Sequence, residues 1–370
     1  MSTRPDNRPP LPAAQSDPGR ETASGAATAA PDVPGLLDAI SETIRVMRLP
    51  LLMGPLLVHA CLAPQTLPTQ YILSHVIGDV SVPAFFFVSG LLYFASYDGT
   101  PRCYVRKLRS RVRSLAVPYL LWNLIGYFAL AYVVHMVAKS DFLRSFWAVR
   151  VARRLSASAP VDGPLYFIKG LFFLALAAPA FHLALRRKTL VWLVPVTVLF
   201  WLLAPVPSLA DRMFAVATPM FLLGGLFALR GQNMLQRLVT SGRAALIAIG
   251  VFLTVSAVNI GLHWAGIDCK AVQRLNILMG IPAWFAVSGM LSRGALTPIL
   301  RRAQGFAMFL FCSFDLIMTV FREIWPSLRH TGDVYCLTVA LMTFAASLAA
   351  YLTLAIVARP LLQLLVGPRR

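Results

Sequence analysis

His59 is the residue whose type and setting best suit catalysis. It lies inside an apolar segment, residues 46–64, and ionisable side chains at membrane depth are rare and commonly functional. A histidine can act as a general base because imidazole titrates near neutral pH. The alternative is an imidazole that only hydrogen bonds to a neighbouring helix, and position alone does not separate the two.

Arg48 is the natural companion of His59, because it precedes it by eleven residues. On an ideal helix this spacing is ~16 Å of rise and close to three full turns, so both side chains point to one side. With Arg48 at the cytoplasmic edge, His59 lies near the middle of a ~30 Å hydrocarbon core. Gly54-Pro55 lies between them and is expected to kink the helix.

A basic segment follows the second apolar run and could bind phosphates. It has six cations in twelve residues: Arg102, Arg106, Lys107, Arg109, Arg111 and Arg113. Arg102, Arg106, Arg109 and Arg113 fall on one helical face, and guanidinium groups bind phosphate bidentately. The alternatives are a topology signal and anionic lipid binding.

Further polar residues lie within apolar segments. Ser89-Gly90 offers a small contact point with a hydroxyl, or helix packing alone. Lys169 either snorkels to the interface or points into a polar cavity, and Asp315 is expected to face the bundle interior. The cysteines show no metal-ligand spacing and predict inert core residues without a disulfide; they are Cys61, Cys103, Cys269, Cys312 and Cys336.

The elements that must position these residues are membrane helices. The 370 residues are 58% hydrophobic and 13% charged, about half the charge of a soluble domain. Spanning segments must satisfy their backbone internally, so we predict an all-α polytopic membrane protein of about ten helices. They are expected at 46–64, 72–95, 114–138, 164–185, 189–204, 213–229, 244–264, 275–292, 303–321 and 333–358. The run 189–204 is short and contains Pro195.

The net charge of +19 would suggest nucleic acid in a soluble protein. Here the positive-inside rule explains it, with both termini cytoplasmic and Lys and Arg concentrated in inner segments. The basic stretch 139–163 is the exception on the outer side. It is either an interfacial element touching an anionic head group or substrate, or a loop whose charge is tolerated. Residues 1–34 are predicted to be a disordered cytoplasmic tail rather than a signal peptide.

Four motifs together resemble the membrane acyltransferase-3 family of bacterial O-acetyltransferases. Arg48 and His59 match its Arg-x10-His motif. The run ending Phe86-Phe87-Val88-Ser89-Gly90 matches Phe-Phe-x-x-Ser-Gly, and Arg106-Lys107-Leu108-Arg109 matches Arg-x-x-Arg. The stretch 111–123 is similar to the family's basic-to-Pro-Tyr-x-x-Trp entry into the third span. The resemblance covers residues 40–360.

The resemblance implies an enzyme of the bacterial inner membrane that moves an acyl group, usually acetyl, from acyl-CoA to a hydroxyl of a cell-surface or lipid-linked carbohydrate. Acetyl-CoA is then a co-substrate, with no permanently bound cofactor, no metal and no nucleic acid, and membrane lipids surround the 40–360 domain. The implied catalytic residues are His59, as general base or as brief carrier of the acyl group, and Arg48, which orients the thioester or stabilises negative charge. The other implied site residues are Arg106, Arg109, Arg111 and Arg113 for acyl-CoA, and Ser89, Gly90, Lys169 and Asp315 for the cavity.

Two departures from the family pattern bear on activity. Tyr166-Phe167-Ile168-Lys169 stands where the family often has Trp-Phe-Leu-Arg, and Phe314 stands where many relatives have a histidine. If that histidine were essential throughout the family, this chain would be inactive or altered. The alternatives are therefore a transporter or export component, given the intramembrane ionisable residues, and a non-catalytic relative.

Overall fold

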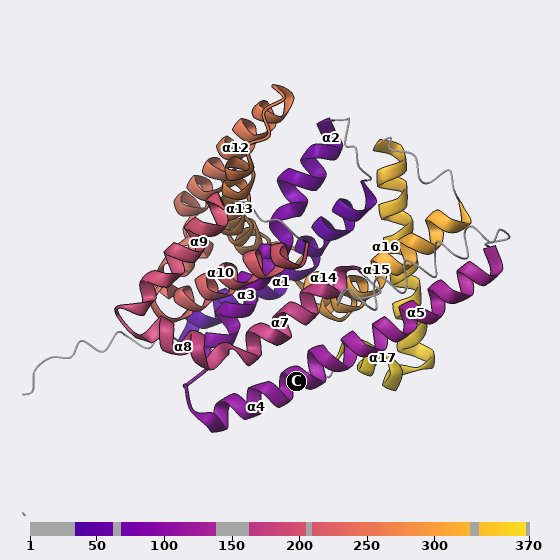
Figure 1. The fold of residues 1–370 in the computed structure, drawn as a ribbon, viewed down its shortest axis with the longest axis horizontal. Coiled ribbons are helices and arrows are strands. Elements are labelled where there is room, and N and C mark those ends of the chain that lie inside the picture. The colour runs from indigo at the N-terminus through magenta and orange to yellow at the C-terminus, as the bar shows by residue number, and fades with distance from the viewer. Residues whose placement is uncertain (1–33, 62–67, 138–162, 205–208, 326–332, 368–370) are drawn as a thin grey trace, which may run out of the picture. The chain divides into compact units, whose positions relative to one another are not determined.

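The regular elements of this chain are helices wherever the structure describes it (Figure 1). The structure, a computed structural model, describes residues 34–61, 68–137, 163–204, 209–325 and 333–367. The elements discussed below belong to one compact unit, Gly35–Arg370. The predicted tail, 1–34, and the basic stretch 139–163 lie outside the described residues, apart from Pro34 and Gly163.

The helices of the first half are α1 (Pro34–Ala60), α2 (Pro68–Tyr71), the π-helical turn η1 (Ile72–Ile77), η2 (Gly78–Val80), α3 (Ser81–Ala95), α4 (Pro101–Arg111), the π-helical turn η3 (Val112–Ala116), α5 (Val117–Val137), η4 (Gly163–Leu165), α7 (Tyr166–Leu176) and α8 (Ala178–Arg186). Those of the second half are η5 (Leu190–Trp192), α9 (Leu193–Leu203), α10 (Leu209–Arg230), α11 (Gln232–Thr240), α12 (Gly242–Trp264), α13 (Lys270–Leu291), α14 (Thr297–Arg302), α15 (Gln304–Ile324), α16 (Asp333–Val357) and α17 (Arg359–Val366).

The ten predicted apolar segments all fold into helix over most of their described residues. Five helical segments of the described chain are long and apolar enough to cross a membrane: Pro68–Ala95, α12, α13, Gln304–Arg322 and α16. The pair α7 and α8 makes a sixth if it counts as one span bent by 61°. The chain is therefore a multi-pass membrane protein, and the prediction of ten spans is confirmed in part.

Some of the other predicted spans are not long, straight apolar helices, and the reasons are physical. Pro179 lies in the first turn of α8, where its missing N–H is tolerated but the preceding helix cannot continue. The run 189–204 gives only the short helix Leu190–Leu203, below the ~20 residues that a straight span needs. The first helix, α1, carries Arg45 and Arg48 beside its apolar half.

Helices α3 and α10 cross in close contact at glycines. A Cβ added to Gly90 would overlap the carbonyl oxygen of Phe221, and one added to Gly224 would overlap that of Phe87. Such small residues let helix backbones approach closely in membranes. Gly90 is therefore a packing point between two helices, which agrees with the interpretation of Ser89-Gly90 as a helix-packing motif. Ser89 beside it is half-buried.

The prediction that the cysteines form no disulfide is wrong. Cys61, directly after α1, is bonded to Cys336 in the first turn of α16, with a Cα–Cα distance of 5.0 Å. The two residues are separated by 275 positions, and no local spacing signals such a pair. Cys103 and Cys312 are buried and Cys269 is half-buried, and these three cysteines lie outside the disulfide.

Candidate active site

Helix α1 runs alongside α15 and meets it at two matched positions. The Arg48 guanidinium donates to Gln304 Oε1 at 3.3 Å, and His59 Nδ1 lies 3.0 Å from Asp315 Oδ1. Since both pairs are 256 residues apart, eleven residues separate the contacts on either helix. Arg48 and His59 thus both face α15, as their spacing predicts, and the helices lie parallel here.

Asp315 holds one side of the His59 imidazole in place. Its second carboxylate oxygen, Oδ2, accepts a hydrogen bond from the backbone N–H of Gly163 at 3.3 Å. The ring of Phe314 meets the imidazole edge-on, with centroids 5.3 Å apart. The side chains of His59 and Asp315 are 35% and 19% exposed. A carboxylate at Nδ1 favours the tautomer that leaves Nε2 able to accept a proton.

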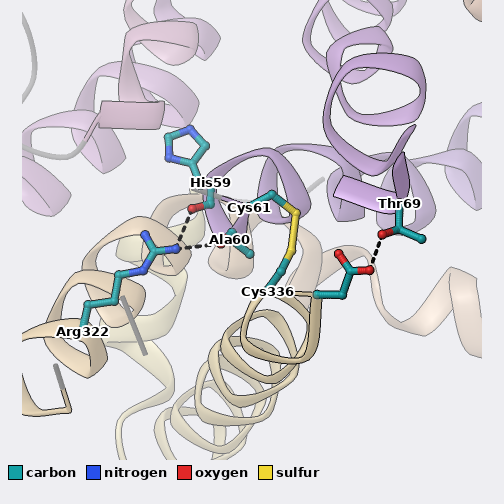
Figure 2. Close-up of a disulfide and its surroundings, with 7 residues drawn as sticks. His59, Ala60, Cys61, Thr69, Arg322 and Cys336 are labelled. Carbon is teal, nitrogen blue, oxygen red and sulfur yellow. Dashed lines mark hydrogen bonds between the residues drawn. A yellow bond between two sulfur atoms is a disulfide. The ribbon is translucent and has the colours of Figure 1, made fainter. Parts of the chain in front are cut away.

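The backbone that carries His59 is anchored at the end of α1 (Figure 2). Arg322 on α15 donates to the carbonyl oxygens of His59 and Ala60, at 3.0 and 2.8 Å. These are carbonyls of the last helical turn, which lack intrahelical partners. The disulfide between Cys61 and Cys336 follows directly. Helix α15 and the first turn of α16 therefore fix the position of this backbone.

The basic segment divides into two faces on the amphipathic helix α4. The helix begins at Thr100, whose hydroxyl accepts from the N–H of Cys103, with Pro101 in its first turn. Its exposed face carries Arg102, Arg106 and Arg109, and the fourth predicted arginine, Arg113, is also exposed in the following turn η3. These are available to an anion from outside the bundle.

The other two cations of this segment turn inward. Lys107 donates to the carbonyl of Tyr93 at 3.1 Å and to Ser96 Oγ at 2.7 Å, and burial lowers the pKa of its ammonium group. Arg111 lies over the ring of Tyr93, 6.0 Å from its centroid. Arg111 thus does not belong to the exposed face, so the predicted acyl-CoA set does not form one surface.

Two of the sequence-predicted site residues, one on α1 and one on α15, are brought together by the fold. His59 and Asp315 are in contact, whereas Arg48 meets Gln304 rather than His59. Lys169 is half-buried near the start of α7. Sequence reasoning missed Gly163 and Arg322 as partners of this region. One signal was available: an intramembrane carboxylate needs a partner, so Asp315 implied a nearby hydrogen-bond donor. The sequence did not indicate which residue that donor is.

Comparison with known proteins gives two matches. Residues 44–359 match the family model described as an acyltransferase domain, which bears out the resemblance indicated by the four motifs. The chain is 25% identical over 362 residues to the succinoglycan biosynthesis protein ExoH of Rhizobium meliloti (strain 1021), covering 89% of this chain and 93% of that protein. No solved structure matches the chain.

Proposed function

Because this chain belongs to the acyltransferase-3 family, we propose that it transfers a short acyl group, acetyl in the first instance, from acyl-CoA to a hydroxyl of a cell-surface or lipid-linked carbohydrate. The observation that carries the proposal is the contact between His59 and Asp315 at 3.0 Å, reinforced by the Gly163 N–H. An oriented imidazole beside a carboxylate is the arrangement that general base catalysis requires.

In the proposed reaction, His59 Nε2 takes the proton of the acceptor hydroxyl as its oxygen attacks the thioester carbonyl. A C–O bond forms, the C–S bond breaks, and the imidazolium returns the proton to the departing thiolate of coenzyme A. Asp315 stabilises the imidazolium while it exists and holds the ring through Nδ1. The products are the carbohydrate ester and free coenzyme A, so atoms and charge balance.

The donor is proposed to approach α4 from the cytoplasm. Arg106 and Arg109 lie on the exposed face of that helix, which suits the nucleotide phosphates of acyl-CoA, with Arg113 extending the surface. Arg48 lies about 16 Å of helix rise from His59, toward the inner end of α1, so its guanidinium is proposed to orient the donor's polar arm on the way to the base rather than to contact the reacting carbonyl. Ser89 and Lys169 complete the proposed route as cavity residues.

The orientation is proposed to be ten spans with both termini in the cytoplasm of a bacterial inner membrane. The basic residues of α4 support this through the positive-inside rule. The disulfide between Cys61 and Cys336 supports it independently, because disulfides persist in oxidising compartments outside the cytoplasm. Cys61 follows His59 by two residues, so this orientation puts the base toward the outer side, where an exported glycan would be acylated.

The acceptor class rests on the relative's name, which assigns ExoH to succinoglycan biosynthesis. Succinoglycan is a polysaccharide, and we extend that substrate class to this chain as part of the proposal.

The decisive experiment uses the purified full-length protein in nanodiscs with radiolabelled acetyl-CoA and, in parallel, succinyl-CoA. Alkali-deacylated surface polysaccharide from the producing bacterium serves as acceptor. We expect label in the polysaccharide with wild-type protein and a loss of at least ~10²-fold with His59→Ala. His182→Ala, which alters a buried histidine of α8, is the matched control for folding.

Two outcomes would overturn the proposal. Undiminished transfer by the folded His59→Ala variant would show that His59 is not the general base. Movement of intact acyl-CoA or glycan across a proteoliposome bilayer, without a new ester, would favour the transporter alternative.

A further inference from the structure

A second imidazole–carboxylate pair lies on the helical segment that begins at Pro68. His75 Nδ1 is 2.9 Å from Asp79 Oδ2, and both side chains are 37% exposed. His75 is part of η1, and π-helical turns within helices are frequent at functional sites. The proposed transfer chemistry uses neither residue, so the pair requires its own explanation.

The depth of this pair argues against exposure to lipid. Asp79 is eleven residues into the span Pro68–Ala95, which corresponds to ~16 Å along a helix. A carboxylate at such a depth that faced hydrocarbon would be strongly destabilised, and such groups therefore face the bundle interior or a polar opening. The exposed atoms of His75 and Asp79 are thus available to a polar ligand.

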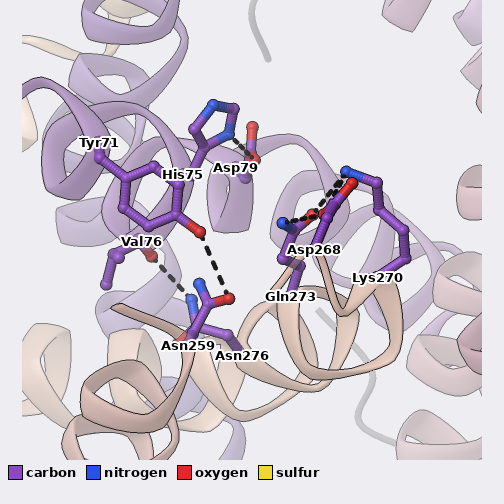
Figure 3. Close-up of polar contacts among 9 residues, drawn as sticks. All are labelled: Tyr71, His75, Val76, Asp79, Asn259, Asp268, Lys270, Gln273 and Asn276. Carbon is purple, nitrogen blue, oxygen red and sulfur yellow. Dashed lines mark hydrogen bonds and ion pairs between the residues drawn. The ribbon is translucent and has the colours of Figure 1, made fainter. Parts of the chain in front are cut away.

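Aromatic rings continue from this pair toward α12, beginning with Tyr71, which Figure 3 shows beside His75. The buried Tyr71 ring lies 5.1 Å from that of His75 and stacks on His263 at 3.8 Å, nearly parallel. Trp264 meets His263 edge-on at 5.0 Å and is 47% exposed. An exposed indole beside polar groups suits a sugar, whose C–H face stacks on the ring while its hydroxyls hydrogen bond.

Side-chain amide groups lie next to these aromatic rings. The Tyr71 hydroxyl donates to Asn259 Oδ1 at 3.5 Å. Asn259 is 2% exposed, and in the part of the chain that the structure describes its Nδ2 has no hydrogen-bond partner. Gln273 bonds to Asp268 at 3.0 Å in the adjoining turn (Figure 3). The buried Tyr71 and Asn259 thus hold the aromatic rings from the inside, and the ligand meets the exposed His75, Asp79 and Trp264.

This second region lies at the same end of the bundle as His59. Thr69 donates to Asp333 in the first turn of α16, the turn that also holds Cys336 (Figure 2). On the other side, a Cβ on Gly78 would meet the Val58 side chain, so Gly78 and Val58 are neighbours. The two imidazole–carboxylate pairs therefore lie on adjacent helices.

The start of α7 connects the two pairs. Gly163 donates to Asp315, and Tyr166, three residues later, is close enough to Asp79 for the carboxylate to act on it electrostatically. A ligand held at His75 and Asp79 could thus extend past Tyr166 toward His59.

We propose that His75, Asp79 and Trp264 form the carbohydrate-binding subsite of this enzyme, which holds the acceptor while His59 acts on its hydroxyl. The inference rests on the proposed function and adds the location of the acceptor. Asp79 accepts hydrogen bonds from sugar hydroxyls, His75 contacts a neighbouring hydroxyl, and Trp264 supplies the stacking surface.

The test measures steady-state acylation of the deacylated polysaccharide in nanodiscs, with acceptor and acetyl-CoA varied separately. We expect Asp79→Asn and Trp264→Leu each to raise KM for the polysaccharide about tenfold, with KM for acetyl-CoA unchanged and kcat within about threefold, since ~1.4 kcal/mol corresponds to tenfold in affinity. Asp38→Asn and Trp192→Leu, which alter an exposed aspartate and an exposed tryptophan elsewhere, should leave both constants unchanged.

The outcomes separate this inference from the proposed function. If wild type transfers acyl groups and the two variants leave the polysaccharide KM unchanged, the subsite is wrong while the activity stands. An equal effect of Trp192→Leu and Trp264→Leu would make Trp264 an ordinary interfacial anchor. If wild type transfers nothing, polysaccharide binding measured by isothermal titration calorimetry still decides the subsite, because wild type should bind and Trp264→Leu should lose at least tenfold in affinity.

Discussion

The two imidazole–carboxylate pairs have nearly the same internal geometry and opposite origins. His59 and Asp315 are 3.0 Å apart and come from helices separated by 256 residues. His75 and Asp79 are 2.9 Å apart and lie four residues apart on one helix. Helix geometry alone brings the second pair together, whereas the first pair exists only when α1 and α15 are packed.

The difference teaches what each pair is suited to do. A general base must be held in one orientation by neighbours that are themselves fixed. Asp315 has this support, because the Gly163 N–H occupies its second oxygen and Arg322 anchors the His59 backbone. The local pair is more exposed and is suited to contact a ligand.

The sharpest way to break this comparison is to neutralise each carboxylate in turn. We expect Asp315→Asn to lower kcat on the order of 10³-fold, because an amide neither selects the productive imidazole tautomer nor stabilises the imidazolium. Asp79→Asn should leave kcat within about threefold and act on the polysaccharide KM instead. Acylation kinetics with both substrates varied check the split. Equal losses of kcat in the two variants would contradict the division of roles.

The same contrast explains how much the sequence predicted. The all-helical membrane fold followed from the apolar segments, and the shared direction of Arg48 and His59 followed from their spacing of eleven. The partner of His59 did not follow, because nothing local links residue 59 to residue 315. The pair His75 and Asp79 was accessible from its spacing of four within an apolar segment, yet it was overlooked because no motif marked it.

Other misses share a physical cause. The disulfide between Cys61 and Cys336 depends on where α16 begins relative to the end of α1, which composition does not report. The inward turn of Arg111 onto Tyr93 depends on which side of α4 meets α3. The helical period correctly grouped Arg106 and Arg109 on one face, but it could not say that this face is exposed.

The exposed arginines of α4 extend the comparison to the second substrate, acetyl-CoA. We expect the double variant Arg106→Ala/Arg109→Ala to raise KM for acetyl-CoA about tenfold, because two guanidinium–phosphate contacts are lost. The polysaccharide KM should not change. Arg243→Ala, which alters an exposed arginine at the start of α12, is the matched control. An unchanged KM for acetyl-CoA in the double variant would reject the phosphate contact.

Removing the disulfide should affect the two imidazole–carboxylate pairs differently, because only the pair of His59 and Asp315 depends on the packing of separate helices. We expect Cys61→Ser/Cys336→Ser to lower the free energy of unfolding by ~2–4 kcal/mol and kcat by about fivefold, since Cys61 is two residues from His59. The polysaccharide KM should be unchanged, because one helix carries both His75 and Asp79. Thermal unfolding and acylation kinetics, with and without reductant on wild type, check this. A larger effect on the polysaccharide KM than on kcat would reverse the expected order.

Phe314 offers the finest test, since it touches the imidazole of His59 without a hydrogen bond. Its edge-on ring contact at 5.3 Å is worth ~0.5–1.5 kcal/mol beyond burial, so we expect Phe314→Leu to lower kcat about threefold by loosening the ring. Phe306→Leu removes a buried ring of the same helix that packs on Phe344 instead. Both variants should lose similar stability in thermal unfolding, but only Phe314→Leu should change kcat. Equal kcat losses in Phe314→Leu and Phe306→Leu would mean that both rings act through the general packing of α15. The orientation of His59 would then depend on Asp315 and not on the Phe314 ring.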